Sequence, residues 1–291
     1  MNEKVKDKRI IVSVSGGKDS TAMCLHLLEN GYTINDFDRI FFDTGWENIR
    51  TYEYLDKLEK TIGPITRIKQ HVEIYEGYEE HIAHFEKRLG FESPFVRTVF
   101  KKLMFPRRLV KWCTTALKVK PAKEYFLNLE YDYINLVGIR RQESKRRAAM
   151  PEFEWSESFD CWIWRPLIDW SEKDVIDIHH RFGLIPNPLY LEGSHRVGCW
   201  PCIMSRKKEF GNLDEDRIEL IHDLEILITE LRKERFPDIE LPATFFQARN
   251  KDDQYPIKRV IEWSKTSRGG KQFELFATDE PTCVKWGLCN V

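Results

Sequence analysis

Residues 15–20 have the sequence Ser-Gly-Gly-Lys-Asp-Ser, in which two glycines precede a lysine and a carboxylate. A β-branched run at residues 10–14 comes before them and apolar residues at helical spacing follow, which predicts a strand, a tight turn and a helix. Because glycine lets the backbone turn without Cβ clashes, successive N–H groups can point into one concavity at the positive end of the helix dipole. This order of residue types therefore predicts an anion-binding loop.

We expect the whole loop to contact nucleotide phosphates, which involves Ser15, Gly16, Gly17, Lys18, Asp19 and Ser20. The loop is shorter than a Walker loop and does not match that motif. Asp19 or Ser20 is expected to cap the helix that follows, and Gly31 to end it.

Polar residues also end the apolar strand predicted at 39–45. Asp43 and Thr44 stand there, and ligands of open α/β sheets sit outside the carboxyl ends of the strands. We therefore expect both side chains to face the same crevice as the glycine loop. Carboxylate oxygens are preferred Mg²⁺ ligands, so either Asp19 or Asp43 is expected to hold that ion.

Basic residues follow the strand predicted at 133–138. Arg140, Arg141 and Arg147 come within ten residues of its end, and a guanidinium at that edge can clamp a phosphate with two parallel hydrogen bonds. Ordinary surface arginines on a loop are the alternative. The expected catalytic residues are thus Lys18, Asp19, Asp43, Arg140 and Arg141.

Five cysteines are candidate metal ligands, namely Cys113, Cys199, Cys202, Cys283 and Cys289. The spacing of Cys199 and Cys202 supplies half of a tetrahedral site that a second pair can complete. Zinc and an iron–sulfur cluster both remain open, as does the choice of four ligands, and a redox pair is a third reading. Cys24 and Cys161 lie in apolar surroundings and are expected to be small buried residues.

The elements that must position these groups alternate between strand and helix. Helices are expected at 47–61 and 73–89 and a short strand at 65–68, which indicates an α/β, doubly wound, mostly parallel sheet. A long amphipathic helix at 213–235 is expected to pack rather than to form a site. We expect residues 1–195 to form the nucleotide-binding domain and residues 196–291 a helical, cysteine-bearing extension packed on it.

The segment 93–123 carries nine Lys or Arg residues and no Asp or Glu. Four aromatic residues, Phe95, Phe100, Phe105 and Trp112, are interleaved with them. Cations beside aromatic rings suit a polyanion whose phosphates pair with the charges and whose bases stack on the rings. A basic surface over core aromatics explains the same pattern.

Global composition adds few constraints. The 291 residues have a net charge of −1, so overall charge predicts no partner. No apolar run reaches the length of a membrane span and no secretory signal is present, so we expect a cytoplasmic protein whose cysteines are thiols or ligands.

Four stretches together resemble the phosphoadenosine phosphosulfate reductase family of the pyrophosphate-loop (adenine nucleotide alpha-hydrolase-like) superfamily: residues 15–20, residues 43–45, Trp112-Cys113 with Lys118 and Pro121, and residues 138–144 with Arg147. The resemblance implies nucleotide contacts from the loop and from Asp43, Thr44, Lys118, Arg140, Arg141 and Arg147. In iron–sulfur members, cysteines like Cys113, Cys199 and Cys202 ligate a 4Fe–4S cluster.

Two features differ from the iron–sulfur reductases of that family. They have adjacent cysteines where this chain has Cys113-Thr114, so a further ligand is expected from Cys283 or Cys289. They also end in a Glu-Cys-Gly motif, which residues 287–290 do not match. The intact Gly-Gly-Lys-Asp-Ser loop looks more like members that use ATP, including DNA phosphorothioation proteins.

The sequence thus predicts an ATP pyrophosphatase or adenylyltransferase, active in sulfur transfer to a nucleic acid or a small molecule. Its expected cofactors are ATP, Mg²⁺ and either a 4Fe–4S cluster or zinc, and its expected partners are a nucleotide substrate and a nucleic acid or a sulfur-donor protein, with no membrane. The alternatives are a sulfonucleotide reductase and a nucleic-acid-binding module with a relic loop.

Overall fold

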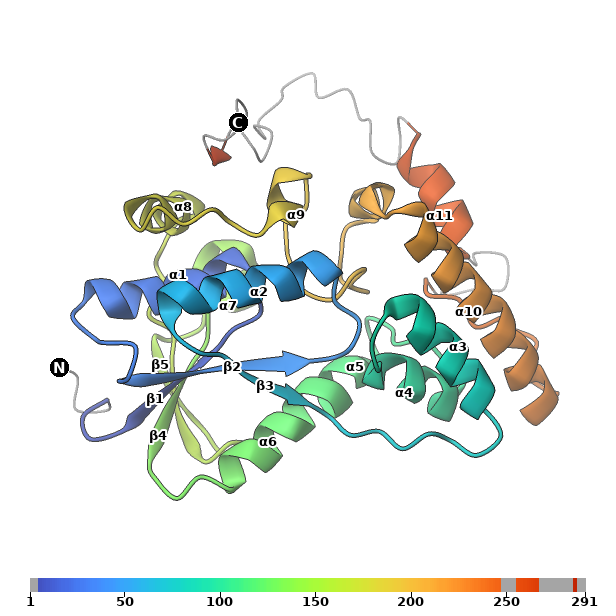
Figure 1. The fold of residues 1–291 in the computed structure, drawn as a ribbon, viewed down its shortest axis with the longest axis horizontal. Coiled ribbons are helices and arrows are strands. Elements are labelled where there is room, and N and C mark those ends of the chain that lie inside the picture. The colour runs from blue at the N-terminus through green and yellow to red at the C-terminus, as the bar shows by residue number, and fades with distance from the viewer. Residues whose placement is uncertain (1–4, 247–254, 267–284, 287–291) are drawn as a thin grey trace.

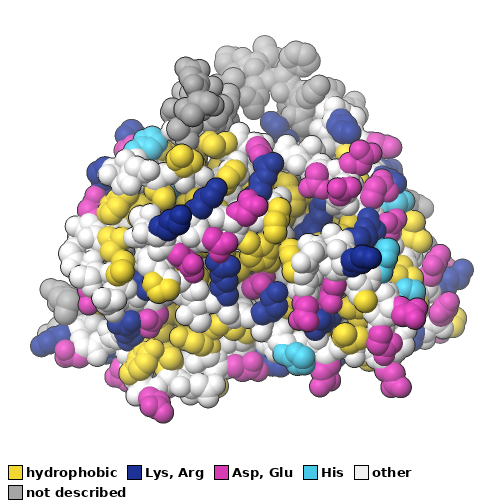
Figure 2. All heavy atoms as spheres, viewed as in Figure 1, with side chains coloured by type: hydrophobic (Ala, Val, Ile, Leu, Met, Phe, Trp, Pro, Cys, Tyr) yellow, Lys and Arg dark blue, Asp and Glu magenta, His cyan; other side chains and the backbone are white. Residues whose placement is uncertain are grey.

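The computed structural model describes residues 5–246, 255–266 and 285–286. Within these ranges, no helix is both long enough and apolar enough to cross a membrane. Both signs of charge are interspersed on the face of the molecule seen in Figure 2.

One six-stranded sheet with the order β3-β2-β1-β4-β6-β5 organises the chain. Its strands are β1 (Arg9–Ser13), β2 (Phe37–Asp43), β3 (Thr66–Lys69), β4 (Tyr133–Leu136), β5 (Phe153–Ser156) and β6 (Cys161–Trp164). All neighbours pair in parallel except β5, which pairs with β6 in antiparallel orientation. The predicted α/β fold with a mostly parallel sheet and a helical C-terminal region is confirmed.

Helices and short turns make up the other elements. They are α1 (Lys18–Glu29), α2 (Ile49–Ile62), α3 (Glu79–Leu89), α4 (Pro94–Lys102), α5 (Trp112–Thr114), the π-helical turn η1 (Thr115–Val119), α6 (Lys120–Leu127), the 3₁₀ turn η2 (Arg141–Glu143), α7 (Lys145–Ala148), α8 (Glu172–Arg181), α9 (Pro188–Leu191), the 3₁₀ turn η3 (Lys207–Asn212), α10 (Glu215–Arg235) and α11 (Ile257–Ser264).

Both faces of the sheet are covered (Figure 1). Helices α1, α2 and α8 bury apolar residues such as Leu25, Leu55 and Val175 against one face, and α6 packs Phe126 against Ile11 on the other. Burial on both faces explains why β1 is a continuous apolar run. The carboxyl ends of β1, β2 and β4 are thereby held at one edge.

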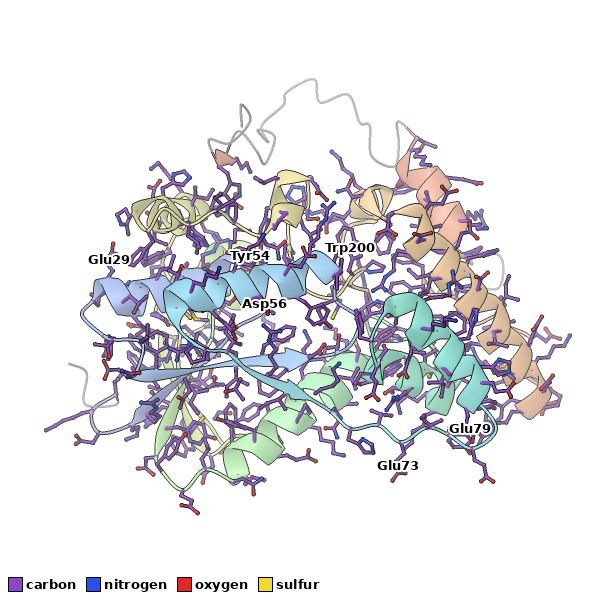
Figure 3. The ribbon with its side chains drawn as sticks, viewed as in Figure 1. Glu29, Tyr54, Asp56, Glu73, Glu79 and Trp200 are labelled. Carbon is purple, nitrogen blue, oxygen red and sulfur yellow. The ribbon has the colours of Figure 1, made fainter. Side chains whose placement is uncertain are left out.

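A second apolar cluster joins α3, α4, α10 and α11 beside that edge (Figure 1). The predicted stripe on α10 is buried there, with Leu220, Ile221 and Leu224 each at most 3% exposed. This layer packs around Trp46 and Trp112, which lie next to candidate site residues. Figure 3 shows Trp200 beside the amino end of α2, between the sheet and this helical layer.

Local details differ from expectation in two places. Neither Asp19 nor Ser20 caps α1, because Gly17 is its N-cap residue and the Ser20 hydroxyl instead accepts a hydrogen bond from the Ser15 N–H at 3.1 Å. Helix α3 begins at Glu79 rather than near residue 73. In both cases the periodicity located the element correctly but not its first turn.

A buried carboxylate predicts a pH-dependent stability of this helical layer. Glu225 of α10 accepts backbone hydrogen bonds from Phe245 at 2.7 Å and Ile257 at 2.9 Å, and burial raises its pKa from 4.5 to about 7. The folded state thus binds this proton more tightly than the unfolded state, so its stabilising contribution is complete below pH 4.5 and is lost as the pH rises through 7. We expect the free energy of unfolding to fall by up to about 3 kcal/mol over that window.

Urea unfolding at pH 5.5 and pH 8 would measure this dependence. The Glu225→Gln variant should show a smaller difference between the two pH values, because an amide does not titrate. Glu53→Gln, at an exposed position of α2, is the matched control. An undiminished difference in Glu225→Gln would assign the pH dependence to another group.

Candidate functional site

The glycine loop between β1 and α1 is closed by its own polar groups. The Ser20 hydroxyl donates to the Gly17 carbonyl at 2.9 Å and accepts from the Ser15 N–H. Gly16 has φ +71°, and a Cβ there would lie 2.9 Å from the Thr51 Cγ2 atom. Only glycine therefore fits the turn, which presents the amino end of α1 to the edge of the sheet.

Lys18 is held by a segment that lies far away in the sequence. Its side chain is 7% exposed, and its ammonium donates to the His195 carbonyl at 3.2 Å and pairs with Glu172 at 3.4 Å. Its backbone N–H donates to the Tyr190 hydroxyl at 3.0 Å. The lysine is thus pre-positioned beside the loop by α8, by α9 and by the segment that follows α9.

Asp19 and Arg140 form a short ion pair across the loop. The Arg140 Nε atom lies 2.6 Å from an Asp19 carboxylate oxygen, and Arg140 is 5% exposed. Gly138 allows this approach, since a Cβ there would lie 3.2 Å from the Asp19 carbonyl carbon. The strand end after β4 therefore brings a buried guanidinium to the loop, as expected from the sequence.

Arg141 does not join that arrangement. Its Nε atom pairs with Asp169 at 2.6 Å, and its Nη1 atom donates to the carbonyls of Ala148 and Met150. The expectation that both neighbouring arginines face the phosphate site is therefore not met. Arg140 is the extended N-cap residue of η2 and Arg141 is the first residue of that 3₁₀ turn, so the backbone changes direction between the two side chains.

A cavity of about 170 Å³ lies over the loop. It is lined by Ser13, Ser15, Gly17, Lys18, Asp19, Ser20, Gly138, Glu143, Arg147, Tyr190, Arg196 and Val197. Arg147, the third predicted arginine, pairs with Glu143 at the wall of this cavity. A lysine, two arginines and a helix amino end make its charge complementary to an anion.

Asp43 and Thr44 lie outside the lining of the loop cavity. The Asp43 carboxylate pairs with Lys69 at 3.0 Å and accepts from the Tyr52 hydroxyl at 2.7 Å. Thr44 donates to Glu47 at 2.8 Å and lies 3.6 Å from the Cys199 sulfur. The carboxyl end of β2 therefore supports the thiol region, contrary to the expected shared crevice with the glycine loop.

Three predicted metal ligands gather around Lys118. The Cys199 thiol donates to Glu47 at 3.7 Å, and the Met204 N–H donates to the Cys202 sulfur at 3.4 Å. Cys199 is the largest cause that raises the pKa of Lys118, and Glu47, Cys202 and Cys113 raise it further. Burial of the ammonium acts in the opposite direction and lowers this pKa. These contacts place Cys113, Cys199 and Cys202 within electrostatic range of one ammonium.

Burial dominates the acidities in this thiol region. It raises the pKa of Cys199 to about 12, although Lys118 favours the thiolate, and it raises the pKa of Cys113. It also raises the pKa of Glu47, again against Lys118. Burial therefore opposes the thiolate form in this region, and the Lys118 ammonium favours it.

The chemistry of this donor set fits a thiolate-bound metal group. Soft sulfur ligands suit zinc or an iron–sulfur cluster, and an ammonium with an N–H donor to sulfur would stabilise the negative charge of either. In the part of the chain that the structure describes, no group of three or more His, Cys, Asp or Glu side chains is close enough together to hold a metal ion. Cys283 and Cys289, the candidates for a further ligand, lie outside the described residues.

A second cavity of about 190 Å³ adjoins the first. Lys118, Cys199 and Cys202 line it, and it shares Ser15, Arg196 and Val197 with the loop cavity. Arg196 is exposed and stands where the two cavities meet. The anion site and the thiol region are therefore contiguous.

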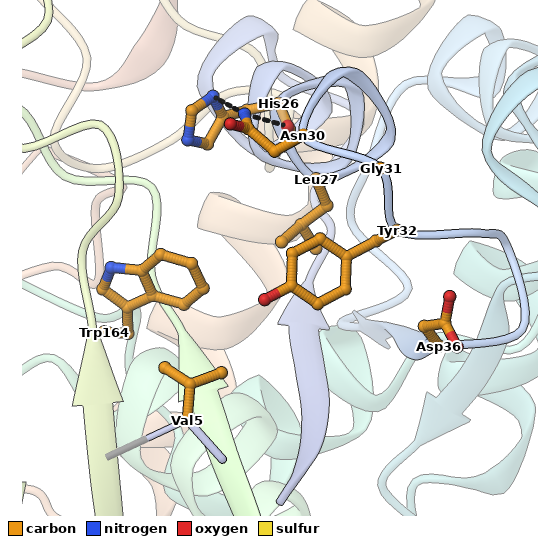
Figure 4. Close-up of a pocket in the computed structure, with 8 residues that line it drawn as sticks. All are labelled: Val5, His26, Leu27, Asn30, Gly31, Tyr32, Asp36 and Trp164. Atoms are coloured by element: carbon orange, nitrogen blue, oxygen red, sulfur yellow. Dashed lines mark hydrogen bonds between the residues drawn. The ribbon is translucent and has the colours of Figure 1, made fainter. Parts of the chain in front are cut away.

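A larger cavity of about 580 Å³ lies elsewhere (Figure 4). It contains His26, Asn30, Tyr32 and Trp164, beside the carboxyl end of α1, and no predicted site residue lines it. Eight residues of helix separate His26 from Lys18, or about 12 Å along the axis. This larger cavity therefore lies at the opposite end of α1 from the glycine loop and its candidate site residues.

Sequence reasoning missed Glu47, Glu172, Tyr190 and Arg196. Glu47 follows a strand end by four residues and Arg196 precedes Cys199 by three, so proximity to predicted features was an available signal. Tyr190 and Glu172 gave no such signal, because only the fold brings them to Lys18.

Comparisons with known proteins support one family. Residues 9–205 match the model of the phosphoadenosine phosphosulfate reductase domain. An uncharacterized 37.8 kDa protein of Escherichia phage 186 is 32% identical, with 96% of each chain covered. The adenosine 5'-phosphosulfate reductase of Allochromatium vinosum is 32% identical, and the aligned region covers 56% of this chain and 57% of that relative. The phosphoadenylyl-sulfate reductase structure from Candida auris has a TM-score of 0.49 and 20% identity, and covers 68% of this chain and 84% of that one.

Proposed function

This chain belongs to the phosphoadenosine phosphosulfate reductase domain family, and on that premise we propose that it is an ATP-using enzyme. In this proposal it joins AMP to an acceptor, releases pyrophosphate and thereby activates the acceptor for sulfur transfer. The observation that carries the proposal is the cationic cavity over the glycine loop, which is contiguous with the thiol region.

The loop would bind the departing pyrophosphate. An acceptor oxygen attacks the α-phosphorus of ATP while the bond from that phosphorus to the β,γ-pyrophosphate breaks, so negative charge grows on the leaving group. Backbone N–H groups at the amino end of α1 and the Lys18 ammonium are placed to stabilise that charge. To do so, Lys18 exchanges its contacts with Glu172 and the His195 carbonyl for phosphate oxygens.

The arginines act at the opposite wall. Arg147 lines the cavity and would neutralise charge at the α-phosphate, and Arg140 holds the Asp19 carboxylate in place. A Mg²⁺ ion, when bound, supplies further charge neutralisation on the phosphates, and Asp19 is the carboxylate of the loop that could hold it. No nucleophilic side chain is required for this reaction.

The thiol region would serve the second half-reaction. A sulfur nucleophile, supplied as sulfide or by a sulfur-donor protein, displaces AMP from the adenylated acceptor, so the C–O bond to AMP breaks as a C–S bond forms. Cys113, Cys199 and Cys202 are the described residues that would hold a metal group, which would supply a binding point for sulfur. Lys118 would balance the negative charge of such a group.

Product analysis tests the proposed class of reaction directly. We expect ATP and Mg²⁺ with the full chain to yield AMP and pyrophosphate, separated by ion-exchange chromatography, because water can take the place of the acceptor and the bond that breaks lies between the α- and β-phosphates. Formation of ADP and phosphate would contradict the proposal. Release of sulfite from adenosine 5'-phosphosulfate with a thiol reductant, without ATP turnover, would assign the reductase activity instead.

A further inference from the structure

The loop between α4 and α5 exposes an aliphatic side chain almost completely. Leu109 is 97% exposed and Val110 is 46% exposed. The loop is nevertheless anchored at both ends, because Phe105 is 0% exposed and Trp112 is 7% exposed. The Arg107 N–H donates to the Val110 carbonyl at 3.0 Å and closes the turn. Leu109 thus stands at the tip of a turn with a defined shape.

Cations surround that tip without acidic partners. Arg107, Arg108 and Lys111 are exposed, and no ion pair is found for them among the described residues. The pKa of Arg232 on α10 is lowered by burial and also by Arg107, so two guanidinium groups stand near each other. A cluster of like charges around the turn favours the binding of an anion.

The structure corrects one part of the sequence prediction for this basic segment. Phe95, Phe100, Phe105 and Trp112 are all buried, so they cannot stack on bases. Arg97 is also unavailable, because it pairs with Glu86 at 2.7 Å. What the segment offers to a polyanion is therefore a cationic turn with a leucine at its tip.

We propose that the turn at residues 106–111 is a nucleic-acid wedge, in which Leu109 inserts between stacked bases while the flanking cations bind the backbone phosphates. Apolar wedges between basic residues unstack a base step in this way, and an enzyme that modifies a base must first take it out of the stack. Leu109 is four residues from Cys113, which is at most about 14 Å of extended chain. A base displaced by the wedge is thus released beside the thiol region.

This inference rests on the proposed function, because it names the acceptor as a nucleobase. An anionic membrane would also match cations beside an exposed leucine. The position of the turn next to Cys113 favours the nucleic acid.

Binding and unstacking can be measured separately with the full chain. The probe is a duplex of about 20 base pairs that carries fluorescein at one end and a central 2-aminopurine, and its affinity is followed over a range of salt concentrations. We expect binding to increase 2-aminopurine fluorescence in the wild type. Leu109→Ala should lose most of that increase while the dissociation constant rises by less than about tenfold. Leu127→Ala, which removes a leucine that is 82% exposed on α6, is the matched control.

The salt dependence of binding tests the role of the cations at the turn. The double variant Arg107→Ala, Arg108→Ala should reduce the slope of log affinity against log salt by about two, since each phosphate contact contributes about one. Lys57→Ala with Lys60→Ala, two exposed lysines of α2, should leave the slope unchanged. An unchanged slope in the arginine variant would overturn the proposal.

Three further results would also overturn it. They are a wild type that does not change 2-aminopurine fluorescence, a Leu109→Ala variant that keeps the full change, and binding of the wild type to phosphatidylserine vesicles that Leu109→Ala abolishes. ATP turnover without nucleic acid, measured in the same proteins, separates this outcome from failure of the proposed function. Leu109→Ala should retain that turnover, because the turn does not line the loop cavity.

Discussion

Replacing Lys18 with alanine should reduce the formation of AMP and pyrophosphate from ATP by about 10²–10³-fold. Charge develops on the leaving pyrophosphate, and Lys18 is the ammonium that lines the loop cavity. The loss should appear mainly in kcat, because the interaction strengthens as the bond to the pyrophosphate breaks. Steady-state release of pyrophosphate measures it.

A structural effect of the same substitution must be separated from the catalytic one. Lys18 pairs with Glu172, and Glu172 also contacts Lys285 at 3.4 Å. Of these two ion pairs, only the one with Lys285 remains when the Lys18 ammonium is removed. Lys18→Met keeps the length of the side chain and should lose activity equally, with an unfolding midpoint close to that of the wild type. Lys173→Ala, an exposed lysine on the same helix as Glu172, is the control that should keep full turnover. If Lys18→Ala protein folds and retains wild-type turnover, the loop does not bind the leaving group.

Replacing Cys199 with serine should remove bound metal from the purified protein. Cys199 lies half-buried beside Lys118 and Glu47, and serine is a poor ligand for zinc and for iron–sulfur clusters. We expect the ratio of metal to protein to fall about tenfold or more, since even residues that only support a metal ligand change affinity by about 10–100-fold. Iron, zinc and acid-labile sulfide in anaerobically purified protein would be measured together.

The appropriate control is a thiol that lies outside the thiol region. Cys161 is 2% exposed on β6 and contacts Tyr133 rather than the thiol region, so Cys161→Ser should keep the wild-type metal content. Cys113→Ser should behave like Cys199→Ser if both thiols are ligands. Iron with matching sulfide in the wild type would identify a cluster and zinc alone would identify a tetrahedral site. Equal metal in wild type and Cys199→Ser would remove Cys199 from the ligand set.

The two cavities explain why these substitutions should act on different steps. Lys18 lies in the loop cavity and Cys199 in the thiol cavity, and the two share Ser15, Arg196 and Val197. We expect Cys199→Ser to retain release of pyrophosphate from ATP while sulfur transfer is lost. Lys18→Ala acts before the sulfur step and should lose both the release of pyrophosphate and the transfer of sulfur.

Local sequence alone determined the strand, glycine turn and helix at residues 9–29, because those features depend on neighbouring residues. The same holds for the parallel sheet, which follows from the alternation of strands and helices. The expectation that ligand-binding residues follow the carboxyl ends of the strands also placed Arg140 beside the loop, where the structure has it. These are properties that a short stretch of chain carries by itself.

Only the tertiary structure decided which polar groups share a site. It pairs Arg140 with Asp19 but Arg141 with Asp169, brings Thr44 to the Cys199 thiol, and brings Tyr190 to Lys18 across 172 residues of chain. It also buries the aromatic residues of the basic segment, which leaves Leu109 exposed at its tip. The physical reason is that a side chain's partner and its burial depend on how distant elements pack, and no local pattern of residue types specifies that packing.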